Sequence, residues 1–163
     1  MKPQFITVHC SASKTGRYLT ASEIRTMHTR PKSQGGNGWS DIGYHAVIRT
    51  DGAVEMGRPL TRMGAGVGGH NQNNLHVCLV GGVDSRGRSV DNYTAAQKNA
   101  LFGLILDWQE QFNIPNEGVK GHRDWFGDTN GDGVIDSRDW YKDCPCFDVV
   151  IWFESQLREL GRL

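Results

Sequence analysis

The chain has 163 residues, of which 37% are hydrophobic and 22% are charged, as in a globular protein with one substantial core. Lysine plus arginine equal aspartate plus glutamate at 18 each, so the net charge gives no general attraction to nucleic acid or anionic lipid. No apolar run approaches the roughly 18 residues of a membrane helix. We therefore expect one domain over residues 1–163, with no nucleic-acid binding and no membrane insertion.

The N-terminus, MKPQFITVHC, contains no apolar segment long enough for a signal peptide. Synthesis and folding in a reducing cytoplasm are therefore expected. In that compartment Cys10, Cys78, Cys144 and Cys146 are better interpreted as core residues or metal ligands than as disulfides.

The first predicted elements are a strand and a helix. Residues 5–8 are apolar and predict a buried strand that ends at His9. Thr20 and Glu23 form a T-x-x-E capping box, which predicts the start of a helix. That helix should stop before Pro31.

The middle of the chain predicts three more strands. An Asp51-Gly52 turn between runs at 44–49 and 53–57 indicates a β-hairpin. Residues 75–80 form a strongly apolar strand. Glycine-rich loops at 33–43 and 64–74 flank these strands, where a substrate groove is common. His70 and Asn73, in the second loop, are therefore candidate substrate-binding residues.

The last third of the chain predicts two helices around a strand. Thr94 and Gln97 form a second capping box, which begins a helix over residues 95–112. Residues 119–121 predict a short strand, and Asp148 can cap a final helix. The expected fold is α/β, with a central mixed β-sheet flanked by about three helices.

Residues 126–140 are rich in aspartate, asparagine and glycine, at the spacing of an EF-hand-like calcium loop. Gly133 occupies the sixth position, where a sharp turn is required. Ile135 is expected to anchor the loop to the core, and the twelfth position carries aspartate instead of glutamate. The predicted oxygen ligands are Asp128, Asn130, Asp132, the Val134 carbonyl, Asp136 and Asp139.

A surface loop held by Asx turns uses the same residue types, so it is the alternative interpretation of this segment. The calcium hypothesis makes the segment a structural insertion, which would hold the residues on either side of it in alignment.

A catalytic zinc usually takes three protein ligands and leaves a fourth position open. His9 and His122 each follow a predicted strand, and Cys144 precedes Pro145, which restricts the backbone after it. Spacing alone does not select three ligands from the six histidines and four cysteines, because the chain lacks an HExxH motif and a CxxC pair.

Five blocks occur in one order along nearly the whole chain: VHCSAS (8–13), DIGYHAVIRTDGAVEMGRP (41–59), NQNNLHVCLVGGVD (71–84), GHRD (121–124) and KDCPCFD (142–148). Together they resemble the zinc-dependent N-acetylmuramoyl-L-alanine amidases, the group of the T-seven phage lysozyme and the peptidoglycan-recognition proteins. The resemblance is closest to the phage endolysin branch.

The resemblance implies that His9, His122 and Cys144 bind zinc, and that Tyr44 and Lys142 are catalytic. Amide cleavage builds an oxyanion and requires a proton for the leaving amine. A phenol and an ammonium group can stabilise the negative charge, and one of them can relay the proton. From the residues alone, the division of these roles stays open.

Three departures from the family stand out. The segment between His122 and Cys144 is lengthened by the calcium-like insertion, and only eight residues precede His9. The short N-terminus gives little support to binding of an RNA polymerase. His76 stands where the phage relatives have a small residue, so the packing around it should differ.

The sequence thus predicts a monomeric endolysin that cleaves peptidoglycan between N-acetylmuramic acid and L-alanine. It would be made in the host cytoplasm and released to the wall by a holin. The alternatives are a non-catalytic peptidoglycan-binding module, a phage RNA polymerase regulator, and a Cys-His thiol hydrolase using Cys144 or Cys146.

Overall fold

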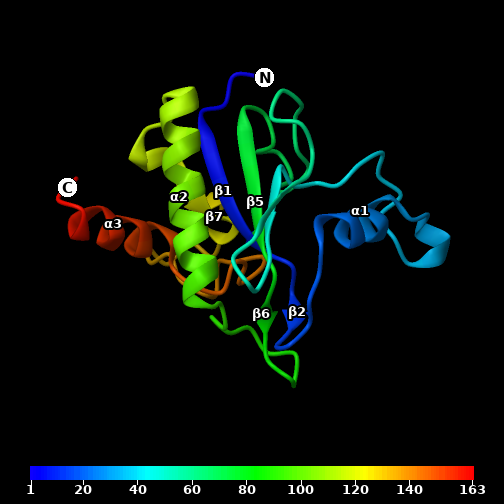
Figure 1. Cartoon of the computed structure of the whole chain (residues 1–163). Coiled ribbons are helices and arrows are strands. Elements are labelled where there is room, and N and C mark those ends of the chain that lie inside the picture. The colour runs from blue at the N-terminus through cyan, green and yellow to red at the C-terminus, as the bar shows by residue number, and fades with distance from the viewer.

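The centre of the molecule is a five-stranded sheet with the order β4-β3-β5-β1-β7, seen in the computed structural model of residues 1–163 (Figure 1). β1 is parallel to β5 and β7, β3 is parallel to β5, and only the β3–β4 hairpin is antiparallel. The predicted mixed sheet is therefore confirmed. Its strands are β1 Phe5–Cys10, β3 Ala46–Ile48, β4 Val54–Met56, β5 Asn74–Leu79 and β7 Val119–Gly121.

A second sheet, which the sequence analysis did not predict, pairs β2 Ser13–Lys14 with β6 Gly82–Val83. Each of its strands has only two residues and continues the chain just beyond β1 or β5. This small sheet extends the same edge of the structure at which β1 ends.

The three predicted helices are present as α1 Ala21–Thr29, α2 Ala95–Phe112 and α3 Val149–Glu159. Both predicted capping boxes form, at Thr20 with Glu23 and at Thr94 with Gln97. Three short 3₁₀ helices complete the structure: η1 Lys32–Gln34, η2 Asn116–Gly118 and η3 His122–Trp125. No helix combines the length and apolarity that a bilayer span requires.

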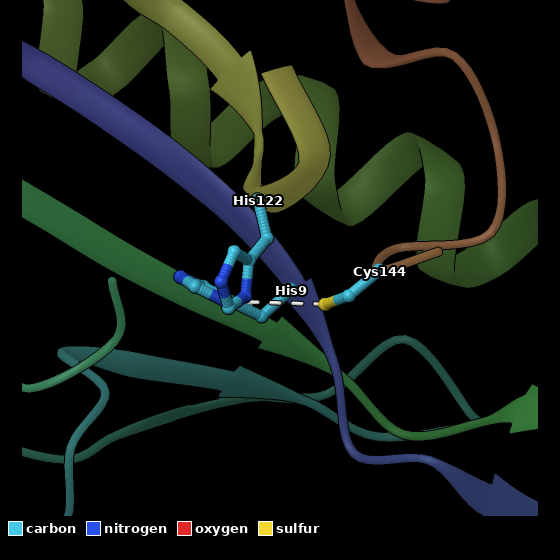
Figure 2. A group of neighbouring side chains, drawn as sticks. All are labelled: His9, His122 and Cys144. Carbon is cyan, nitrogen blue, oxygen red and sulfur yellow. Dashed lines mark hydrogen bonds between the residues drawn. The ribbon is translucent and has the colours of Figure 1, made fainter. Parts of the chain in front are cut away.

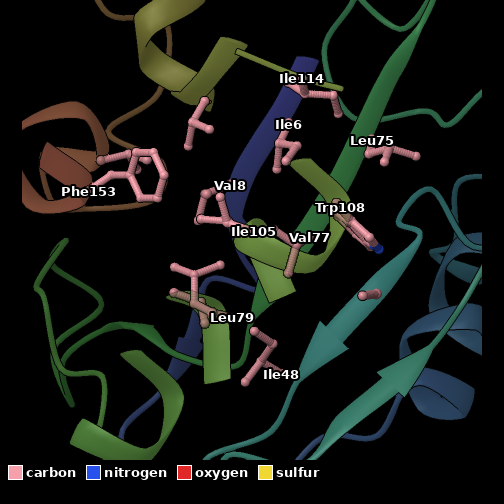
Figure 3. Packing of buried hydrophobic residues seen from close by; sticks show 14 of the residues in the cluster. Ile6, Val8, Ile48, Leu75, Val77, Leu79, Ile105, Trp108, Ile114 and Phe153 are labelled. Atoms are coloured by element: carbon pink, nitrogen blue, oxygen red, sulfur yellow. The ribbon is translucent and has the colours of Figure 1, made fainter. Parts of the chain in front are cut away.

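The helices cover the two faces of the sheet unequally. Figure 1 shows α2 and α3 on one side and α1 on the other. The larger core lies under α2 and α3, where Ile6 and Val8 of β1 pack against Ile105 and Phe153 (Figure 3). Since side chains alternate along a strand, the intervening Thr7 and His9 point to the opposite face.

Gln97 connects the start of α2 to the carboxyl ends of two strands. Its Nε2 donates hydrogen bonds to the carbonyls of Ile48 at 3.2 Å and Val80 at 2.9 Å, and its Oε1 accepts from the Thr94 amide. The side chain is fully buried. The capping box therefore also fixes α2 against the sheet.

Gln97→Met is expected to lower the free energy of unfolding by about 1–3 kcal/mol, because it leaves the buried Val80 carbonyl without its donor. Urea unfolding followed by circular dichroism measures this loss. Thr94→Ala is the control, with an expected cost of about 1 kcal/mol: it removes the cap and the Thr94 Oγ1 hydrogen bond to the Thr50 carbonyl, but leaves the contacts of Gln97 with the strands in place. A Gln97→Met variant no less stable than Thr94→Ala would show that the contact with the strands contributes nothing.

Candidate metal centre

The register of two parallel strands brings His9 and His122 together. Val8 of β1 is paired with Gly121 of β7, and each histidine is the next residue in its chain segment. Parallel strands present their carboxyl ends at one edge, so both imidazoles leave the sheet at the same place. Residues more than a hundred positions apart thereby become neighbours.

Cys144 reaches this edge from the loop before α3, and backbone contacts hold it there. Its Sγ accepts a hydrogen bond from the Cys10 amide at 3.1 Å, and its carbonyl accepts from the Arg123 amide at 2.9 Å. Cys10 and Arg123 directly follow the two histidines. The thiol is therefore positioned by the same segments that carry the imidazoles.

The three side chains point at one another, as Figure 2 shows. His9 Nδ1 lies 3.2 Å from His122 Nδ1 and 3.9 Å from Cys144 Sγ, and the three ligand atoms are mutually within 4.8 Å. A tetrahedral zinc with ordinary bond lengths requires about 3.3 Å between two nitrogens and about 3.6 Å between nitrogen and sulfur. The donor set fits such an ion in both atom type and spacing.

The environment also favours the ligand form of both histidines. Burial lowers the pKa of His9 well below its usual value, with further lowering from His76, His122 and Lys142. Burial, then the charge of Lys142, lowers the pKa of His122 to about 4. Both imidazoles are therefore neutral near pH 7, as metal binding requires.

Arg123 fixes the two ends of the long segment between the second histidine and the cysteine. Its buried guanidinium lies 3.2 Å from Asp143 and 3.6 Å from Asp148, and its centre lies 4.1 Å from the Trp140 ring. These contacts hold the return of the insertion next to η3. The extra length therefore leaves the His122–Cys144 geometry intact.

A hollow of about 490 Å³ opens over the three ligand residues. Tyr44 and Lys142 line it together with His28, Trp39 and Gly66. The Tyr44 ring centroid is 5.2 Å from that of His9. A second hollow of about 450 Å³ shares part of this lining and continues past Phe126 and Tyr141, so the site is open to an extended ligand.

Tyr44 is held in its protonated form. Burial raises the pKa of its phenol well above the usual value, and the neighbouring Cys78 and Cys144 thiols add to the effect. Near pH 7 the hydroxyl is therefore a hydrogen-bond donor. His28, not singled out by sequence reasoning, accepts a hydrogen bond from the Gly43 amide at 3.0 Å and packs on the Tyr44 ring.

Two further histidines stand behind His9. His76 Nδ1 lies 3.0 Å from His9 Nε2, and both side chains are buried. His45 is fully buried too; its Nδ1 accepts the His76 amide and its Nε2 lies 2.9 Å from the Arg62 carbonyl. Sequence reasoning identified His76 only as a departure from the family and did not predict its contact with His9.

The structure does not bring the predicted substrate residues His70 and Asn73 to either hollow. His70 is exposed and packs on Trp125. Asn73 lies just before β5, at the end of the sheet opposite His9, where its carbonyl accepts the Gln4 and Phe5 amides. Asn71, in the same loop, lines the second hollow instead.

The acidic insertion is ordered by its own side chains. Asp128 accepts the amides of Gly131, Asp132 and Gly133, and the buried Asp139 accepts those of Thr129 and Asn130. These are the Asx-type contacts of the alternative interpretation, and they also belong to the geometry of a cation loop.

Two features of the insertion differ from the calcium prediction. Arg138 forms ion pairs with Asp132 at 2.7 Å and Asp136 at 2.8 Å, so a guanidinium neutralises two of the predicted ligands. Ile135 is 61% exposed, so the prediction that it anchors the loop to the core is wrong. The reason is that the loop stays outside both hydrophobic clusters.

Comparison with known proteins agrees with the fold. Residues 1–139 match the family described as N-acetylmuramoyl-L-alanine amidase; the matched region includes His9, Tyr44 and His122 and ends before Lys142 and Cys144. Among solved structures, the amidase LysC from Clostridium intestinale URNW superposes with a TM-score of 0.67 at 24% identity, over 98% of this chain and 86% of that chain.

Two relatives extend the likeness through the cysteine segment. The endolysin of Klebsiella phage KP32 is 38% identical over 150 residues, which cover 92% of this chain and 85% of the relative. The endolysin of Escherichia phage T7 is 36% identical with the same coverage of both chains. The chain therefore belongs to the N-acetylmuramoyl-L-alanine amidase family.

Proposed function

We propose that the protein is an endolysin that hydrolyses the amide bond between N-acetylmuramic acid and L-alanine in peptidoglycan. The observation that carries the proposal is the convergence of His9, His122 and Cys144 at the floor of an open hollow. Their donor atoms fit zinc, and their positions are those that the family resemblance assigns to it. Two endolysins that match nearly the whole chain support the same assignment.

Zinc held by these three residues would supply a Lewis acid and would lower the pKa of a coordinated water to about 7. The chain itself provides the geometry. The paired ends of β1 and β7 orient the imidazoles, and the Cys10 amide orients the thiolate by donating to Sγ. The remaining side of the site faces the hollow, where the substrate enters.

Tyr44 and Lys142, which both line the hollow, complete the proposed mechanism. Because Tyr44 stays protonated, its hydroxyl can donate to the substrate carbonyl oxygen as negative charge develops there. Lys142 is exposed, and its positive charge adds to the effect of burial, which is the main cause of the lowered pKa values of both histidines. We assign Lys142 to charge stabilisation and to proton delivery to the leaving amine.

Since two relatives that match nearly the whole chain are phage endolysins, we propose that the protein is made in the host cytoplasm as a folded monomer and acts on the cell wall only after release. A holin would then give it access to the cell wall. Peptidoglycan is its proposed partner.

Digestion of purified peptidoglycan with the zinc-loaded protein tests the function. Amidase activity is expected to release peptides with new L-alanine amino termini and to leave the glycan strands uncut. New reducing sugar ends without new amino termini would identify a glycosidase instead. Binding to peptidoglycan without any new ends would identify a recognition module.

For the insertion, we propose a structural calcium ion bound by Asp128, Asn130, Asp132, the Val134 carbonyl, Asp136 and Asp139. The support is the spacing of these six oxygen donors and the way Asp128 and Asp139 already close the loop. Calcium has to compete with Arg138 for Asp132 and Asp136, which should lower its affinity.

Millimolar calcium is expected to raise the melting temperature, because an ion that binds only the folded state stabilises it by about 2.7 kcal/mol at 100 times its dissociation constant. Asp132→Ala should abolish the shift, and Arg138→Ala should enlarge it by removing the competing cation. Differential scanning calorimetry with and without calcium measures both. A melting temperature that calcium does not change, in the wild type and in Arg138→Ala, would contradict the calcium site. Arg138 would then be the cation that neutralises the loop in the wild type.

A further inference from the structure

His76 lies inside the structure with no part in the mechanism described above. It occupies the middle of β5, on the face that also carries His9, because β1 and β5 are parallel with Thr7 paired to His76 and His9 to Cys78. Its side chain is fully buried, and its Nδ1 is 3.0 Å from His9 Nε2. The contact is therefore a hydrogen bond shielded from water.

The direction of this hydrogen bond follows from the metal site, and so rests on the proposed function. His9 presents Nδ1 to His122 and Cys144, so the lone pair of Nδ1 must face the metal. In a neutral imidazole the proton is then on Nε2, which donates to His76 Nδ1. His76 is the acceptor, and its own proton is on Nε2.

With the proton on Nε2, His76 has a buried N–H group whose hydrogen bonding has to be accounted for. His76 Nε2 is buried and has no hydrogen-bond partner. A buried donor left unpaired costs about 1–3 kcal/mol. An apolar residue of similar size would fill the same space without this cost, so packing alone does not account for a histidine at this position.

The surroundings hold the His76 ring in one place. Its backbone amide donates to His45 Nδ1 at 2.9 Å, and the two rings stack with an interplanar angle of 19°. The glycine-rich loop closes over the pair: a Cβ at Gly66 would lie 2.6 Å from His76 Nδ1 and 2.8 Å from His9 Nε2. A Cβ at Gly64 would lie 2.4 Å from His76 Cδ2.

We propose that His76 is a positioning residue for the metal centre: it fixes the tautomer and the ring orientation of His9 by accepting the His9 Nε2 proton. Partners of this kind raise the basicity of a ligand and lock its geometry, and their loss typically weakens metal binding about 10–100-fold. His76 acts through His9 and does not touch the substrate, because it does not line either hollow.

Asparagine and leucine at position 76 provide a matched test, because they have nearly the same shape. The Oδ1 of asparagine can take the place of His76 Nδ1 as acceptor, whereas leucine offers no acceptor. Zinc affinity is measured on purified protein by competition with a chromogenic chelator. His76→Leu is expected to lose about 10–100-fold in zinc affinity, and His76→Asn to stay within about threefold of the wild type.

Cobalt substitution gives a second measurement that packing alone would not change. The visible absorption of bound Co²⁺ should shift in His76→Leu and stay close to the wild type in His76→Asn. The melting temperatures of the metal-free proteins show whether either variant has lost its fold. If His76→Leu does not fold, His76→Asn is compared with His76→Gln instead, because the acceptor oxygen of glutamine lies one bond further from the backbone.

Two failures are distinguishable. Wild-type protein that binds no zinc would overturn the proposed function itself. Wild-type protein that binds zinc, with leucine and asparagine variants of equal affinity and equal cobalt spectra, would overturn only the role of His76.

Discussion

Replacing Cys144 with alanine is expected to abolish zinc binding and amidase activity together. Cys144 is the only sulfur ligand in the centre, and its Sγ lies at the spacing a tetrahedral ion requires. Without it, two neutral imidazoles remain at the floor of an open hollow, where water competes for the ion. Metal content by mass spectrometry and the release of L-alanine amino termini measure the two losses in the same sample.

Cys146 provides the matched control, since it is two residues away and its Sγ donates to the Gly82 carbonyl at 3.1 Å. Cys146→Ala is therefore expected to keep one equivalent of zinc. The pair also separates the metal mechanism from a thiol hydrolase. Activity that survives complete chelation would contradict the zinc mechanism. In the zinc-loaded protein, alkylation that abolishes activity without releasing zinc would favour the thiol mechanism.

Tyr44→Phe is expected to lower kcat about 10²–10³-fold while leaving zinc content unchanged. The substitution removes one hydroxyl donor from the wall of the hollow and retains the ring that packs between His9 and His28. Loss of a single donor to a developing oxyanion typically has an effect of this size. Steady-state kinetics on a defined muropeptide measure kcat and KM separately, and the proposed role predicts that kcat carries the loss.

Lys142 extends the same comparison from hydrogen bonding to charge. Lys142→Ala should reduce kcat strongly, whereas Lys142→Arg, which keeps the charge but changes the donor geometry, should retain more activity.

A Tyr44→Phe enzyme with wild-type kcat would remove the phenol from the mechanism. Loss of zinc from that variant would instead make Tyr44 a residue of the metal environment.

Local signals in the sequence were sufficient for the helices. The two capping boxes predicted the starts of α1 and α2, and residues 95–112 coincide with the observed α2. Such signals act over three or four residues, so no distant part of the chain is needed to interpret them. The β2–β6 pair, by contrast, joins two-residue segments far apart in the chain, and nothing in either segment identifies its partner.

The metal centre was predicted through the family resemblance, because spacing along the chain did not select among ten histidines and cysteines. The structure supplies the physical reason for the selection: the register of β1 with β7 makes His9 and His122 neighbours. The same dependence on register explains why the His76 contact was missed. It crosses from one strand to the next, and strand order cannot be derived from the residues of either strand alone.

The insertion shows where motif spacing reached its limit. The positions of its oxygens match a calcium loop. The pattern takes no account of Arg138, whose guanidinium competes with a cation for the carboxylates of Asp132 and Asp136. Nor does the pattern determine whether an apolar residue meets a core. Whether Ile135 is buried depends on where the loop packs, which only the three-dimensional structure shows.

The close packing of Gly66 against His76 has a consequence for how this protein can change over generations. With histidine at 76, a Cβ at 66 would lie 2.6 Å from that imidazole and 2.8 Å from His9 Nε2. A substitution at 66 therefore requires a smaller residue at 76 and also a small shift of the His9 ring. Residue 76, in turn, can shrink only if another group takes over the Nε2 proton of His9. The two positions are therefore an epistatic pair, and the order in which they mutate decides which intermediate sequences survive selection.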